Sequence, residues 1–150
     1  MMYRTHLVFG ILMGLVFLNS FRIPSPWLFM FVVMVGASLP DIDMHKSKVG
    51  GLMKPFSFLI NMFLGHRGLV HSLLMAFITY FAFWVFFGLN YAAAIFIGYS
   101  SHLFLDAFTP KGISPFWPFK TKLNGIIKTG GILEIGLFFL FLVAVLLVLA

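Results

Sequence analysis

The sequence predicts an all-α membrane protein, a polytopic helix bundle of about five transmembrane helices plus one interfacial or re-entrant helix. Of the 150 residues, 61% are hydrophobic and 9% are charged, and the mean hydropathy of +1.06 lies far outside the range of soluble proteins. The apolar stretches continue unbroken for about a dozen to twenty residues instead of alternating with polar residues, which favours helices over a barrel. We therefore expect residues 1–150 to form a single integral membrane domain.

The first expected span covers residues 5–19, where Gly10 and Gly14 have the spacing that lets transmembrane helices approach closely. Residues 1–20 also resemble a signal peptide, but no A-x-A-like cleavage site follows, so we expect this segment to remain in the protein. A turn with Pro24 and Pro26 leads into a second span, residues 27–39, which ends at Pro40.

The middle of the chain contains an apolar piece, residues 55–64, that is too short to span a membrane comfortably. Because Pro55 suits the first turn of a helix, we expect this piece to lie at the interface or to dip into the bilayer. Two further spans follow, from Ser72 to Phe87 and from Tyr91 to Phe108, with a turn at residues 88–90. The Pro- and Gly-rich residues 109–130, with Trp117 as an aromatic anchor, read as a surface loop before a last span at 131–150.

Charge is distributed very unevenly along this chain. Ten Lys and Arg residues against four Asp and Glu residues give a formal net charge of +6, and they lie in short segments between apolar spans. This placement indicates contact with the lipid bilayer and excludes nucleic acid as the preferred partner. Threading five spans places every acid, every histidine and nine of the ten basic residues on one side, Arg22 being the exception. The positive-inside rule makes that side cytoplasmic and places the N-terminus there.

The polar end of the fourth span carries the strongest chemical signal. His102 and Asp106 are four residues apart, so on a helix both side chains lie on one face and are able to grip one cation. Threading adds further histidines and acids at the same side. Imidazole and carboxylate ligands suit one or two divalent metal ions, with Zn favoured and Mn or Fe possible, whereas the absence of cysteine excludes thiolate ligands.

Several of these residues have alternative interpretations. His6 is either a ligand or an interfacial histidine at a helix end, and His45 is either a ligand or a loop histidine. On an ideal helix His66 and His71 would project about 140° apart, so either the helix begins after Gly68 or only one of them is a ligand, with His71 favoured. The acids could instead form an interfacial salt-bridge network with the lysines and Arg67.

Four residues are candidates for direct roles in catalysis: Asp43, Arg67, Lys111 and Glu134. Arg67 and Lys111 adjoin candidate ligands and could hold a phosphate, or they could act as headgroup anchors. Glu134 could be a metal ligand, a general base or a partner of a loop lysine.

A set of short motifs, in this order and at these span ends, resembles a known family. The motifs are Thr5-His6, Pro-Asp-Ile-Asp at 40–43, His66-Arg67-Gly68 with His71-Ser72, Ser101-His102 with Leu105-Asp106-Ala107, and Thr109 with Gly112. They resemble the inner-membrane metal-dependent hydrolases regulated by LexA. The resemblance implies a hydrolase of a prokaryotic cytoplasmic membrane with the metal ligands His6, Asp41, Asp43, His66, His71, His102 and Asp106. A more distant likeness, through His102 and Asp106, is to zinc-dependent phospholipase C and P1 nuclease.

The function expected from the sequence is metal-dependent hydrolysis of a lipid-linked phosphoester, either a phospholipid or an isoprenoid phosphate, at the cytoplasmic leaflet by metal-activated water. A metal-ion transporter or metal-sensing membrane protein is the alternative. A conduction path for ions would require polar residues through the whole thickness of the bilayer, whereas the acids and histidines of this chain are expected at one side of it. A membrane protein that recruits a cytosolic partner is a third class, but it leaves the histidines unexplained.

Overall fold

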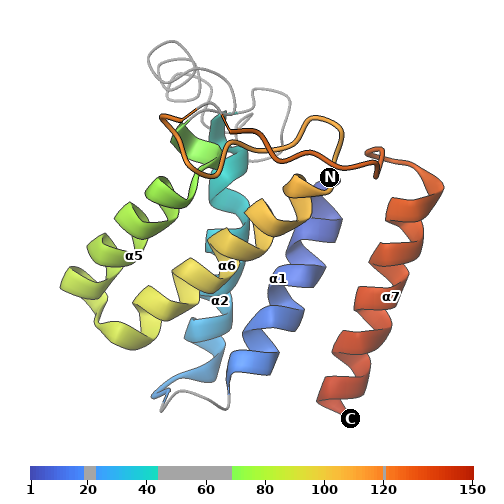
Figure 1. Ribbon diagram of the computed structural model, residues 1–150. Coiled ribbons are helices and arrows are strands. Elements are labelled where there is room, and N and C mark those ends of the chain that lie inside the picture. Colours follow the sequence, from blue (N-terminus) through green and yellow to red (C-terminus); the bar gives the residue numbers. More distant parts are fainter. Residues whose placement is uncertain (19–22, 44–68, 120) are drawn as a thin grey trace.

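The computed structural model describes residues 1–18, 23–43, 69–119 and 121–150, and within them the protein is built from helices (Figure 1). The α-helices are α1 (Tyr3–Leu18), α2 (Pro26–Ser38), α5 (Leu73–Phe87), α6 (Leu89–Ala107) and α7 (Ile132–Leu149). There are also two short 3-10 turns, η1 (Leu39–Asp43) and η2 (Leu69–His71). In these ranges β pairing is limited to one isolated bridge between Ile113 and Leu123, so the predicted all-α class is confirmed.

The five α-helices correspond to the five expected spans within a few residues. By length and composition, one helix of the described part, α7, is long and apolar enough to cross a membrane unaided. Helices α1, α2 and α5 are apolar but shorter, at 16, 13 and 15 residues. The number of membrane-spanning helices therefore stays a prediction. The expected interfacial helix at 55–64 lies outside the described residues.

The turn between α5 and α6 is tighter than the sequence suggested. Gly88 alone connects them, with a φ of +83° that L side chains rarely adopt. Helix α6 consequently begins at Leu89, so the expected turn over residues 88–90 is wrong by two residues. The sharp reversal packs α6 against α5, and Figure 1 shows α6 crossing between α5 and α1.

Helices α2 and α6 approach closely enough for their backbones to touch. A Cβ atom at Gly98 would stand 2.0 Å from the carbonyl oxygen of Val33, and one at Gly36 would stand 2.5 Å from that of Ile95. Helix α1 joins them through the predicted small-residue face, which is confirmed, since a Cβ at Gly10 would lie 2.9 Å from the Cβ of Ala37. These contacts fix where the polar ends of α1, α2 and α6 meet.

Substituting Gly98 by Ala is expected to separate α2 from α6, because the clashing atom is backbone and cannot rotate away. Overpacking typically costs about 1–3 kcal/mol, and this site should reach or exceed the top of that range. Thermal unfolding in detergent measures the change. Gly136→Ala is the matched control, since a Cβ there meets nothing within 4 Å. Equal melting temperatures for the two variants would refute this packing account.

One end of the bundle gathers the starts of α1, α5 and α7 and the ends of α2 and α6 (Figure 1). The N-terminus lies at this end, and the connection from α6 to α7 runs across it. That connection is tied down by backbone hydrogen bonds, including Leu73 N–H to the Pro115 carbonyl at 2.9 Å and Gly125 N–H to the Thr109 carbonyl at 3.0 Å. Residues of α1, α2, α5, α6 and α7 therefore meet at this end of the bundle.

Candidate metal centre

Asp106, near the end of α6, lies at the centre of a buried polar cluster. Its Oδ1 is 3.3 Å from His6 Nε2, and its Oδ2 is 3.7 Å from His71 Nε2 and 3.8 Å from His102 Nε2. The Met1 amino group also donates to Oδ1 at 2.6 Å. All of these side chains are at most 2% exposed. A single carboxylate therefore faces three imidazoles away from bulk solvent.

His102 is oriented by a carbonyl group of the neighbouring helix. Its Nδ1–H donates to the Ala37 oxygen of α2 at 2.7 Å, which leaves Nε2 as the ring nitrogen with the free lone pair. Nε2 points at Asp106 and lies 3.9 Å from Asp41 Oδ1, and it has no hydrogen-bond partner among the residues that the structure describes. Such a backbone bond on the far nitrogen is the usual way in which proteins orient a metal-binding histidine.

The other two histidines are placed by the elements around them. The His6 ring, in the first turns of α1, stacks on that of His102 with a centroid distance of 3.7 Å and an interplanar angle of 7°. His71 belongs to the η2 turn, which is held to α6 because the Tyr99 hydroxyl donates to the Val70 carbonyl. Helix α5 begins only at Leu73, after the Ser72 N-cap, which agrees with the alternative in which the helix begins after Gly68.

The geometry of the cluster suits a divalent metal. Two groups have ligand atoms within 4.8 Å of one another, His6 with His102 and Asp106, and Asp41 with His71 and His102. Ligand atoms of a tetrahedral zinc site lie about 3.4 Å apart, given Zn–N and Zn–O distances near 2.1 Å. The separations from 3.3 to 3.9 Å are close to this value. His102 belongs to both groups, and because its Nδ1 is engaged, both groups would use the same atom, His102 Nε2.

The structure therefore brings together five of the seven predicted ligands: His6, Asp41, His71, His102 and Asp106. The side chains of His66 and Asp43 lie outside the described residues, as do Arg67 and the undecided His45. Lys111, predicted to hold phosphate, is exposed in the turn that follows α6. Its role stays a prediction.

Glu134, on the first turn of α7, is fully buried but belongs to neither ligand group of the described residues. Its Oε1 accepts the Met2 backbone N–H at 2.5 Å, and its Oε2 accepts that of Gly130 at 2.6 Å. The carboxylate thus links the start of α1 to the start of α7. The residue it binds, Met2, adjoins Met1, whose amino group contacts Asp106. The predicted general-base role is untested by this geometry.

Glu134→Gln is expected to lower the free energy of unfolding by about 1–3 kcal/mol, because the amide turns an NH₂ group toward a backbone N–H donor in a buried place. Thermal unfolding with and without added metal measures this loss. The metal content of the folded variant should equal that of the wild type, since Glu134 is not placed among the ligands. A variant that folds normally but loses its metal would place Glu134 in the centre.

Sequence reasoning missed the Ala37 carbonyl. The hydroxyl groups next to two of the histidines bond to backbone instead, since Ser72 caps α5 and donates to the Leu69 carbonyl, and Ser101 donates to that of Gly98. Backbone acceptors have no residue signature, so only the close α2–α6 contact could have pointed to Ala37.

Comparison with known proteins places the chain in a family. The family model described as YdjM inner membrane protein matches residues 1–150. The Bacillus subtilis (strain 168) protein YvsG is 37% identical over 103 residues, which cover 67% of this chain and 64% of YvsG. The inner membrane proteins YdjM of Escherichia coli (strain K12) and Shigella flexneri are each 35% identical over 92 residues, covering 57% of this chain.

The chain spans only part of these relatives, 47% of each YdjM protein and less than two thirds of YvsG. No solved structure matches the chain. The expected bacterial inner-membrane location is confirmed at the level of the family, whereas metal dependence, hydrolysis and the likeness to P1 nuclease stay predictions. The chain belongs to the YdjM inner membrane protein family.

Proposed function

We propose that this protein is a membrane-embedded metal-dependent hydrolase that acts on a lipid-linked phosphoester at the cytoplasmic leaflet. The observation that carries the proposal is the buried cluster in which His102 Nε2, fixed by the Ala37 carbonyl, meets Asp106 and Asp41. Ionisable groups are costly in membrane helices, and clusters of them are retained for a function. Here, three histidines and two acids from four elements converge, which structural pairing alone does not require.

Five residues of the chain would form such a metal centre. His6, His71, His102, Asp41 and Asp106 would hold the metal, with Asp106 presenting one oxygen to His6 and the other to His71 and His102. A divalent metal held there supplies Lewis acidity, which activates water near neutral pH and polarises a phosphoryl oxygen. Asp41 is the most exposed of the five, at 8%, so a substrate would approach from the end of α2.

The position of the cluster fits a lipid substrate. The cluster lies at the end of the bundle that also carries the basic connection between α6 and α7, with Lys111, Lys122 and Lys128. By the positive-inside rule this end, with the N-terminus, faces the cytoplasm, and the described helices cross the membrane as a multi-pass bundle. A phosphate headgroup at that depth would meet both the lysines and the metal.

A phosphate-release assay tests the proposal. Purified protein in detergent is supplied with Zn²⁺ or Mn²⁺ and a panel of phospholipids and isoprenoid phosphates, and phosphate or headgroup release is measured. We expect release that a chelator abolishes, that added metal restores and that Asp106→Asn lacks. Metal flux into sealed vesicles without any hydrolysis would instead support the transporter and overturn the hydrolase.

A further inference from the structure

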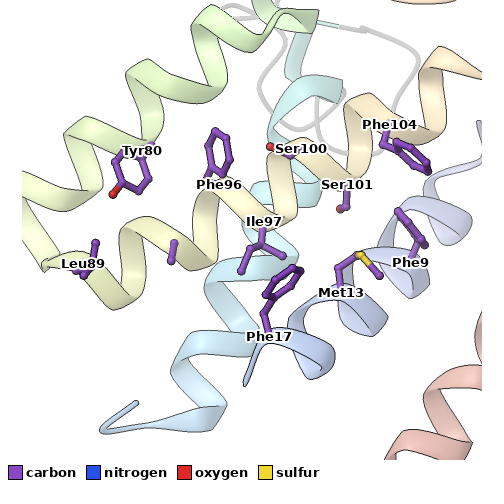
Figure 2. Close-up of a pocket in the computed structure, with 11 residues that line it drawn as sticks. Phe9, Met13, Phe17, Tyr80, Leu89, Phe96, Ile97, Ser100, Ser101 and Phe104 are labelled. Carbon is purple, nitrogen blue, oxygen red and sulfur yellow. The ribbon is translucent and has the colours of Figure 1, made fainter. Parts of the chain in front are cut away.

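An open apolar groove lies beside the metal centre (Figure 2). Its volume is about 760 Å³. Helix α6 forms the floor with Phe96 and Ile97, α1 forms one wall with Phe9, Met13 and Phe17, and α5 contributes Tyr80 on the other side. The lining is almost entirely hydrocarbon and aromatic.

The groove runs along α6 and ends next to the cluster. From Leu89 to Phe104, both in its lining, α6 advances about 22 Å at 1.5 Å per residue. At the near end, Ser101 directly precedes the ligand His102, and Phe9 lies one turn from the ligand His6 on α1. The rings of Phe9 and Phe104 close this end with a centroid distance of 5.9 Å. Groove and centre are therefore neighbours along two helices, α1 and α6.

A hydroxyl group lies at the polar end of the groove. Ser100 is one of the lining residues, and its Oγ atom is shielded from solvent and has no hydrogen-bond partner within the described ranges. Its neighbour Ser101 is already engaged, since it donates to the Gly98 carbonyl at 2.7 Å. Buried hydroxyl groups in folded proteins are nearly always hydrogen-bonded. Ser100 thus indicates a ligand with a polar atom at this end and an apolar body beyond it.

We infer that the groove binds one hydrocarbon chain of the lipid substrate, with the ester end at Ser100 and the phosphate at the metal centre. This inference rests on the proposed function and assigns the substrate a chain-binding site. A methylene group occupies about the volume of a liquid water molecule, roughly 30 Å³, so the groove has room for roughly 25 carbons. That is enough for one chain of about 16 carbons but not for two of that length, which would need about 32 carbons.

The test compares long- and short-chain esters with the same phosphate group in two matched variants. Ala93→Trp fills the groove from its floor, whereas Ala82→Trp makes the same change on the exposed face of α5 outside the lining. With metal-loaded full-length protein in detergent, we expect Ala93→Trp to lower kcat/KM for hexadecyl phosphate at least tenfold and to leave that for butyl phosphate unchanged. Ala82→Trp should change neither value. Equal kcat/KM for hexadecyl phosphate in the two variants would overturn the inference.

Equilibrium binding of radiolabelled hexadecyl phosphate separates this inference from the proposed function. If the wild type hydrolyses neither ester, the hydrolase proposal fails and the groove is judged by binding alone. Binding at least tenfold weaker in Ala93→Trp than in Ala82→Trp supports the chain site, and equal binding refutes it. Should Ala93→Trp not fold, Met13→Trp fills the same groove from the α1 wall and is held to the same outcomes.

Discussion

Replacing His102 by Ala is expected to remove the metal and all metal-dependent hydrolysis while the helices stay folded. His102 belongs to both ligand groups, and its Nε2 is oriented by the Ala37 bond, so among the described residues no other side chain is shared by the two groups. Structural zinc binding is worth about 10–16 kcal/mol, and one ligand of four or five contributes about 2–4 kcal/mol. The affinity for Zn²⁺ should therefore fall by roughly 30- to 1000-fold, measured by competition with a chromophoric chelator.

The control for this variant is Leu103→Ala on the next position of α6. Leu103 is 2% exposed and packs in the apolar core with Tyr99 and Ala76, so its truncation should cost about 2–5 kcal/mol of stability. Its metal affinity should nevertheless remain within a few-fold of the wild type. If both variants lose metal to the same extent, the loss reflects unfolding and the assignment of His102 fails.

Asp106→Asn is expected to abolish metal binding even though the side chain keeps its shape. The substitution removes the charge that faces His6, His71, His102 and the Met1 amino group, and an amide is a poor ligand for zinc. We expect at least a 100-fold loss of metal affinity and no detectable phosphate release. Isothermal titration with Zn²⁺ and the release assay measure the two effects.

Glu134→Gln makes the same chemical change at another buried acid. Both carboxylates are at most 1% exposed, but Glu134 bonds to backbone N–H groups while Asp106 faces imidazoles. The two variants should thus differ: Asp106→Asn should lose metal, and Glu134→Gln should lose stability. Parallel loss of metal in both would mean that buried charge, and not ligation by Asp106, holds the centre together.

Much of this arrangement was predictable because membrane topology constrains it. The spacing of His102 and Asp106 predicts a shared helix face, and threading five spans brings His6, Asp41 and His71 to the same end. The structure reproduces that convergence, with residues of α1, η1, η2 and α6 meeting around His102 and Asp106. Because successive spans alternate in direction, the order of the polar residues along the chain determines which end of the bundle each one reaches. This part of the site was therefore predictable from the sequence.

The rest depends on contacts that no local pattern encodes. The Ala37 carbonyl orients His102 only because Gly98 lets α6 touch the backbone of α2, and that pairing joins residues 65 positions apart in the chain. The turn was expected to cover residues 88–90, yet the positive φ of Gly88 alone suffices to reverse the chain. The groove is likewise formed by three helices together, so its lining could not be read from any one of them.

The metal content of the purified protein tests the central claim most directly. Wild-type protein and Asp106→Asn, prepared side by side in detergent without added metal, are analysed by inductively coupled plasma mass spectrometry together with Glu134→Gln. We predict at least one transition-metal ion, preferentially zinc, per wild-type and Glu134→Gln chain, and none in Asp106→Asn. Folded wild-type protein that contains no metal and takes up none when Zn²⁺, Mn²⁺ or Fe²⁺ is supplied would contradict the account.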